Sequence, residues 1–275
     1  MRIRTITKAS AIAAAAVLAT AGTAHAALLA EETFDAGTGD WTEYGATIAN
    51  DSGNLLVTGS GENYGTYSYY GGVASSTSTE RTTALGDGYV SEIDVYLDPA
   101  VTTVGEGFDL SVAASRVADG SHLRDFIFHV GEVTDGRLLV NGSNNTDFVV
   151  NEYKLLNENG GDFYDVTDAG WYTLQHSFYD NEGVLAVDLN LLDAEREILW
   201  TATRSNAGDA AAEVGGARYQ WLMGVDGSFR FDNQSLERVE VKPVDQCGDN
   251  AWEAQGFKNQ GQCIASLVAN EKAGR

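Results

Sequence analysis

The chain is organised as short runs in which apolar and polar residues alternate, separated by clusters of glycine, asparagine, aspartate and serine. Alternation gives a strand one apolar and one polar face, because successive side chains point to opposite sides of a sheet. No long apolar stripe with helical spacing precedes residue 245. The runs are Asn54–Thr58, Tyr89–Leu97, Phe108–Ala114, Asp125–Val130, Arg137–Val140, Trp171–Phe178, Val184–Leu191, Glu197–Thr203, Tyr219–Met223 and Ser235–Val241. The pattern predicts an all-β protein with two stacked antiparallel sheets.

The N-terminus has a different composition. Arg2, Arg4 and Lys8 precede an alanine-rich apolar run, and small residues then end in Ala24-His25-Ala26, the pattern that a signal peptidase accepts. The sequence therefore predicts a cleavable signal peptide over residues 1–26 and a secreted, extracellular protein. The apolar run is about ten residues long, against the ~20 needed to span a bilayer, and we expect no membrane anchor.

The chain is strongly acidic, with a net charge of −23 over 275 residues. Removing residues 1–26 would remove three basic groups and no acidic one, which brings the charge to −26. Such a surface repels nucleic acid and anionic membranes. We therefore expect no nucleic-acid partner, although the charge itself specifies no partner. We also expect a monomer that binds a poly- or oligosaccharide.

The C-terminal end predicts a small appendage. Pro243 marks a linker, so the expected domains are a β-sandwich over residues 27–242 and an appendage over 243–275 with one short helix around 260–270. In an exported chain, the pair Cys247 and Cys263 favours a disulfide. It would close a loop of about 16 residues, worth ~3 kcal/mol. A metal site is the weaker alternative, since two cysteines without a nearby histidine supply too few zinc ligands.

Several stretches carry a resemblance to known proteins. The many short strands, closing on Phe231-Asp232-Asn233 before the last run, resemble the concanavalin A-like lectin/glucanase jelly roll. The likeness is closer to a group of secreted, largely uncharacterised actinobacterial proteins, and it covers about residues 85–235. The matching stretches are Arg124–Phe128, Ser143–Asn145, Gly170–Thr173, Gly183–Leu189 and Arg218–Trp221. The resemblance implies a jelly-roll sandwich and an extracellular setting, but no established activity.

The C-terminal cysteine segment resembles a short module of undefined role at the ends of such exported proteins. The matching residues are Cys247, Trp252, Phe257, Lys258, Asn259, Gln260, Gly261 and Cys263.

One segment resembles part of a catalytic motif. Laminarinase-like glycoside hydrolases on this fold carry Glu-Ile-Asp followed by a second glutamate, and this chain has Glu92-Ile93-Asp94. The second position is occupied here by Tyr96 or Leu97. The next carboxylate on that face, Asp98, is about 20 Å from Glu92 along the strand, at ~3.3 Å per residue. Retaining hydrolysis needs two carboxyls about 5–5.5 Å apart, so we assign no catalytic residue and favour an exposed acidic strand face.

Other catalytic motifs are absent from the sequence. It contains no Gly-x-Ser-x-Gly elbow, no His-Glu-x-x-His and no P-loop. A metal triad of Asp125, His129 and His176 is conceivable, but a four-residue spacing puts Asp125 and His129 on one face of any strand. Whether the protein is an enzyme stays open.

A saccharide site is the leading expectation. The resemblance implies binding on a concave sheet or its rim, through aromatic faces and planar polar groups. The candidates are Arg124, Asp125, His129, Asn144, Asn145, His176, Arg218, Tyr219 and Trp221. The alternative is that these are ordinary sandwich residues, with Trp221 and Trp171 in the core. The stretch Tyr64–Gly72 suits either a sugar-stacking edge or plain β-structure, since tyrosine and threonine favour strands.

Calcium is the ion most compatible with this sequence. The resemblance implies a structural ion between the first and last strands, and Ca²⁺ takes six or more oxygen ligands. The candidates are Glu32, Asp35, Asp40 and Asp232.

Taken as a whole, these features predict a secreted, non-catalytic, carbohydrate-associated binding protein. Two alternatives stay open: a glycan-active hydrolase or lyase on the same fold, and an envelope or matrix component.

Overall fold

The computed structural model describes residues 26–146, 162–239, 247, 251–254 and 256–273. The strands are β1 (Ala26–Glu32), β2 (Thr42–Tyr44), β3 (Thr47–Asp51), β4 (Asn54–Ser60), β5 (Gly65–Ser68), β6 (Tyr89–Leu97), β7 (Gly107–Arg116), β8 (His122–Glu132), β9 (Leu138–Asn144), β10 (Tyr164–Val166), β11 (Gly170–Asn181), β12 (Val184–Leu192), β13 (Ile198–Ala210) and β14 (Val214–Val239). The helical segments are η1 (Glu80–Thr82), η3 (Ala211–Glu213), α1 (Ala251–Ala254) and α2 (Gln260–Ala273). The all-β, antiparallel prediction is confirmed.

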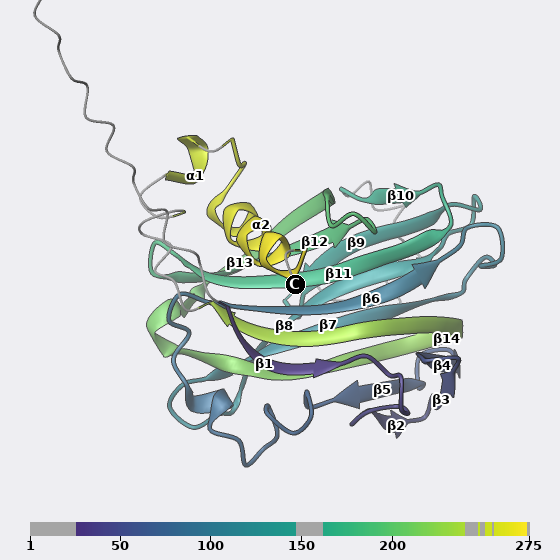
Figure 1. Cartoon of the computed structure of the whole chain (residues 1–275), viewed down its shortest axis with the longest axis horizontal. Helices are drawn as coiled ribbons and strands as arrows, with labels where there is room; N and C mark the ends of the chain where they lie inside the picture. Colours follow the sequence, from purple (N-terminus) through teal and green to yellow (C-terminus); the bar gives the residue numbers. More distant parts are fainter. Residues whose placement is uncertain (1–25, 147–161, 240–246, 248–250, 255, 274–275) are drawn as a thin grey trace, which may run out of the picture.

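The strands form two layers that share one long strand. Pairing runs in the order β10-β9-β8-β7-β14-β6-β11-β12-β13, while β5, β4 and β1 pair with the other side of β14. Val214–Asp226 of β14 pairs with β7, and Arg230–Arg238 pairs with β6. Between these parts, Gly224 and Gly227 have φ values of 58° and 105°, which glycine adopts without a steric penalty. The layer of β6 and β11 lies in front of the layer of β7 and β8 in Figure 1.

The core lies between the two layers and is rich in phenylalanine. Phe108 and Phe126 of one layer meet Phe231 and Phe178 of the other, with ring centroids 5.2 Å and 5.5 Å apart. All four side chains are completely buried. Each such burial stabilises the fold by roughly 1.5–3 kcal/mol. Alternation along each strand thus supplies one wall of the core, which is the predicted jelly-roll sandwich.

Two features of the strand layout differ from the sequence prediction. The predicted runs Tyr219–Met223 and Ser235–Val241 belong to the single strand β14 as far as Val239, the last described residue of that run. In addition, β1, β2, β3, β5 and β10 were not among the predicted runs. They carry little readable alternation: β2 is exposed at all of its residues, and β10 has only three.

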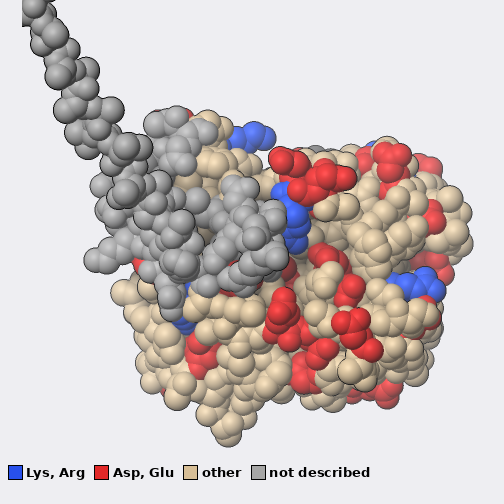
Figure 2. Space-filling model, in the orientation of Figure 1, with Lys and Arg blue, Asp and Glu red and all other residues tan. Residues whose placement is uncertain are grey.

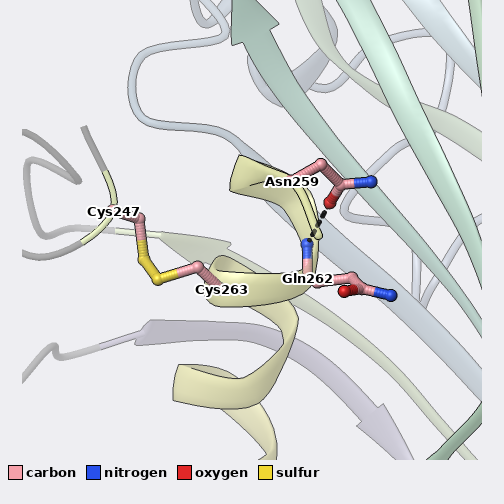
Figure 3. Close-up of a disulfide and its surroundings, with 4 residues drawn as sticks. All are labelled: Cys247, Asn259, Gln262 and Cys263. Atoms are coloured by element: carbon pink, nitrogen blue, oxygen red, sulfur yellow. Dashed lines mark hydrogen bonds between the residues drawn. A yellow bond between two sulfur atoms is a disulfide. The ribbon is translucent and has the colours of Figure 1, made fainter. Parts of the chain in front are cut away.

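The C-terminal appendage packs on the outer face of β11 and β12. The predicted disulfide is present between Cys247 and Cys263, and the helix expected around 260–270 is α2. The side chain of Asn259 caps this helix, because its Oδ1 accepts a hydrogen bond of 2.8 Å from the Gln262 amide (Figure 3). The disulfide lies in a buried cluster with Val90, Tyr179, Ala186, Val239 and Ile264.

Acidic side chains gather across the middle of the face that carries α2, with few lysines or arginines among them (Figure 2). In the described part of the chain, no helix is long and apolar enough to cross a membrane. The predicted signal peptide lies outside the described residues except for Ala26, and its cleavage stays a prediction.

Candidate functional site

An open groove lies on the outer face of the layer that contains β7 and β8. Its volume is about 580 Å³, within the range of small-molecule sites. We call it the aromatic groove. It is lined by Tyr44, Gly45, Glu62, Asn63, Tyr64, Gly65, Asp125, Ile127, Asn145, Trp221, Met223 and Gly224.

Strand alternation places the floor of the aromatic groove. Phe126 and Phe128 point into the core, so Asp125 and Ile127 of β8 point outward. The same alternation buries Leu222 and leaves Trp221 of β14 on the outer face. Strand β7 lies between them, with Ser111 opposite both Trp221 and Ile127. The walls come from Tyr44 at the end of β2 and from the turn between β4 and β5.

Aromatic side chains surround the groove. Trp221 meets Tyr44 and Tyr219 edge to face, with ring centroids 6.1 Å and 5.9 Å apart. Tyr44 is 62% exposed and Tyr64 is 37% exposed, so both rings are open to solvent. Tyr67 lies opposite Trp221 on β5. Rings of this kind offer an apolar face and a polar tip to a ligand.

Asp125 is the charged group at the floor of the groove. Its Oδ1 accepts hydrogen bonds from Ser111 Oγ at 2.9 Å and Tyr219 OH at 2.8 Å, and its Oδ2 lies 2.7 Å from His122 Nε2. Burial by itself would raise the pKa of Asp125, but the hydrogen bonds and the His122 charge outweigh it, so that the pKa is lowered. A carboxylate has about four acceptor positions, so these three donors leave capacity for one more.

Tyr219 supports Asp125. Burial, followed by the Asp125 charge, raises the pKa of Tyr219, so its hydroxyl keeps its proton and donates a hydrogen bond to the carboxylate. Asp125 thereby stays a fixed, ionised acceptor.

The predicted binding residues fall into two groups. Asp125, Asn145 and Trp221 line the groove, and Tyr219 adjoins it. Arg124 instead holds the end of β9: it binds both carboxylate oxygens of Asp209 and donates to Asn145 Oδ1 at 3.1 Å. Arg218 donates to the Gly120 carbonyl at 2.7 Å, away from the groove lining.

The structure removes His176 and Asn144 from the candidate site. His176 points into the core, completely buried, with its ring 4.9 Å from that of Phe128. Burial lowers the pKa of His176 to about 3, so it stays neutral. Asn144 is buried, and its Oδ1 accepts a hydrogen bond from the Thr146 amide. Because strand alternation puts His176 between the layers, it cannot join Asp125 in a metal triad.

His129 lies on the same outer face as Asp125 but is also completely buried. Its Nδ1 is 2.7 Å from Asp109 Oδ1, and its Nε2 is 2.7 Å from Ser143 Oγ.

The predicted calcium ligands do not form a cluster. Among the described residues, no group of three or more histidines, cysteines, aspartates or glutamates is placed to hold a metal ion. The carboxylates stabilise turns instead: Asp40 accepts from the Tyr69 and Gly71 amides at 3.1 and 2.8 Å, and Glu32 accepts from the Phe34 amide at 2.8 Å. Asp232 accepts from the Asn233 amide, and Asp35 from the Thr33 hydroxyl.

The Glu92-Ile93-Asp94 segment is not the exposed acidic face that we expected. Glu92 is 1% exposed and accepts hydrogen bonds of 2.5 Å from both Gln175 and Arg196. Asp94 is partly buried and accepts from Thr173 Oγ1 and Asn233 Nδ2. The expectation was wrong because residues distant in sequence cover this strand.

The sequence prediction missed several groove residues. Tyr64 was within the tyrosine-rich stretch, but Tyr44, Met223, Ser111 and His122 were not proposed as site residues. Strand alternation assigns a face to Met223, Ser111 and His122, whereas their proximity depends on the register between β14, β7 and β8.

No protein-family model and no curated protein matches this chain. Among solved structures, it is similar to the CBM2 module of the evolved Dit of Lactobacillus casei BL23 phage J-1, with a TM-score of 0.46 and 11% identity, over 80% of this chain and 99% of that one. It is similar to peanut lectin with a 9mer peptide, with a TM-score of 0.44 and 11% identity, over 77% of this chain and 97% of that one. Lectin II from Ulex europaeus has a TM-score of 0.39 and 12% identity, over 77% and 98% of the two chains. These likenesses assign no ligand to this chain, and the resemblance to secreted actinobacterial proteins stays a prediction.

Proposed function

We propose that this protein is an exported carbohydrate-binding protein that holds a saccharide in the aromatic groove. The observation that carries the proposal is the exposure of Tyr44 and Tyr64 beside Trp221, around the ionised carboxylate of Asp125. Aromatic faces suit the apolar faces of pyranose rings, and the carboxylate accepts a hydrogen bond from a sugar hydroxyl. Export rests on the signal-peptide features of residues 1–26.

The charge of the groove narrows the ligand class. Asp125 and Glu62 both line it, and the whole chain carries a net charge of −23. An anionic saccharide would be repelled by this field. The proposal therefore commits to neutral saccharides.

The test compares two tryptophans on opposite faces of the sandwich. Trp221 lines the groove, whereas Trp171 lies on β11, beside Tyr96 at a ring distance of 5.6 Å. A panel of neutral and sulfated polysaccharides is screened by affinity electrophoresis, and hits are titrated by calorimetry. Truncating a tryptophan anchor costs about 2 kcal/mol or more, so W221A should weaken binding at least about 30-fold.

W171A is the matched control and should bind as the wild type does. Three outcomes contradict the proposal: retention of none of the neutral polysaccharides, a preference for sulfated ones, or loss of binding in W171A while W221A still binds.

A further inference from the structure

A serine, a histidine and an aspartate form a hydrogen-bonded row on the outer face of β9, β8 and β7. Ser143 Oγ lies 2.7 Å from His129 Nε2, and His129 Nδ1 lies 2.7 Å from Asp109 Oδ1. His129 and Asp109 are completely buried, and Ser143 is 4% exposed. A nucleophile, a base within hydrogen-bond reach and a third group that orients the base are the parts that acyl transfer requires. Such triads are recognised by geometry, not by their order in the chain.

The partners also decide which nitrogen of His129 carries the proton. An ionised carboxylate only accepts hydrogen bonds, so Asp109 favours the neutral tautomer with hydrogen on Nδ1. The Nε2 atom is then left as an acceptor, and the Ser143 hydroxyl donates to it. This is the arrangement in which histidine removes the proton of an attacking serine.

The row adjoins the aromatic groove. Ser143 pairs directly with Ile127 across β8 and β9, and Ile127 lines the groove. Asn145, another lining residue, is two positions further along the same face. Side chains directly opposite on antiparallel strands are about 4.5–5.5 Å apart at Cβ. Ser143 therefore directly neighbours a lining residue of the groove, although it is not itself part of the lining.

We propose that Ser143 is the nucleophile of an ester hydrolase, with His129 as its general base and Asp109 as the positioning residue. The substrate class is an O-acylated saccharide, and this choice of substrate rests on the proposed function. The proposed reactivity of the Ser143 hydroxyl does not depend on that function.

The reaction balances with water as the second reactant. Ser143 Oγ attacks the ester carbonyl carbon while its proton passes to His129 Nε2. The bond between the carbonyl carbon and the sugar oxygen breaks, and the sugar hydroxyl takes the proton from His129. Water then attacks the acyl-serine, gives a proton to His129 and releases the carboxylic acid, while Ser143 recovers its proton. One ester and one water become one acid and one alcohol.

The first experiment uses a small fluorophosphonate, which carries no sugar. The full-length protein is incubated with the probe, and intact mass and peptide mapping locate the adduct. We expect a single phosphonylated residue, Ser143, with the reagent losing fluoride. Absence of an adduct on Ser143 in the folded protein overturns the proposal and leaves the row as a buried structural network.

Variants separate chemistry from folding. S143A should lose the label, whereas S177A removes a completely buried serine that donates to Gln175 in the other layer and should label as the wild type does. D109N should slow labelling at least about a hundredfold, since an amide can place the ring proton on the wrong nitrogen. Its remaining rate should rise with hydroxide concentration, because His129 with its proton on Nε2 offers no acceptor to the Ser143 hydroxyl, and its unfolding midpoint should stay near that of the wild type. Equal labelling rates in D109N and the wild type contradict the role of Asp109.

The second experiment follows release of acetate from O-acetylated neutral oligosaccharides. W221A should lose turnover of these substrates and keep its fluorophosphonate labelling. If Ser143 is labelled and no saccharide binds, the proposed function is wrong and the assignment of Ser143 as a nucleophile is supported. If a saccharide binds and Ser143 never reacts, the proposed function is supported and the assignment of Ser143 is wrong.

Discussion

We predict that Asp188 makes the docking of the C-terminal helix sensitive to pH. It lies fully buried on β12, directly beneath the start of α2: a Cβ added to Gly261 would lie 2.0 Å from its Oδ2. Its Oδ1 accepts hydrogen bonds from Thr203 Oγ1 at 2.7 Å and Tyr179 OH at 3.3 Å. Burial raises the pKa of Asp188 from 3.8 to about 6, although the hydrogen bonds from Thr203, Tyr179 and Asn259 oppose this.

The free-energy contribution of Asp188 to stability follows from its pKa in the unfolded and in the folded protein. A rise from 3.8 to about 6 corresponds to about 3 kcal/mol, at ~1.4 kcal/mol per unit. Because the pKa is higher in the folded state, this contribution to stability is fully present below pH 3.8 and is lost as the pH rises through about 6. The variant D188N cannot ionise and does not suffer the loss. Relative to the wild type, it should therefore gain about 2 kcal/mol of this between pH 4 and pH 7.

The assay is urea unfolding at half-unit steps from pH 4 to pH 8, followed by tryptophan fluorescence, with hydrogen exchange of the α2 amides as a local readout. Comparing the two proteins at each pH cancels the titration of the other carboxylates. The control E213Q removes an exposed carboxylate on η3 and should give a profile parallel to the wild type. Parallel profiles for D188N and the wild type would refute the reasoning.

Two further predictions concern the same appendage. Gly261→Ala should destabilise the docked helix by about 1–3 kcal/mol, because the new methyl group would meet Asp188 and also Tyr179 at 2.6 Å. Hydrogen exchange of the α2 amides measures this loss of stability. The control is Gly170→Ala, where no atom lies within 4 Å of the added carbon. Replacing both Cys247 and Cys263 by serine should cost ~3 kcal/mol, since the bridge closes a loop with a sequence separation of 16. The urea midpoint should then fall to that of the reduced wild type, and an unchanged midpoint would show that packing alone holds the appendage.

Much of the fold could be predicted because each layer builds its core from local alternation. The side of the strand to which a residue points depends only on its position in the alternation. His176, for example, points to the same side as Leu174 and Phe178, which are both completely buried. Its place in the core was therefore readable from the sequence, although it was proposed as a ligand-binding residue.

The candidate site was less predictable, because it depends on which strands are neighbours. Asp125 and Trp221 are brought together by β7, which pairs with both β8 and β14. Tyr44 comes from a strand with three exposed residues and no alternation to read. The row of Asp109, His129 and Ser143 has the same origin, since each residue comes from a different strand.

The two outer faces of the sandwich also differ in how deeply their polar side chains are buried, and the alternation pattern does not predict this difference. Gln262 of α2 donates to Thr201, which donates to Asn190, and Asn190 donates to Gln175 at 2.9 Å. Gln175 in turn donates to Glu92, so one hydrogen-bonded chain runs from the appendage to the acidic strand. Polar side chains on this face are buried because they satisfy one another and the helix covers them. Polar residues that alternation marks as solvent-facing thus become a buried layer here, whereas the aromatic groove lies on the opposite face.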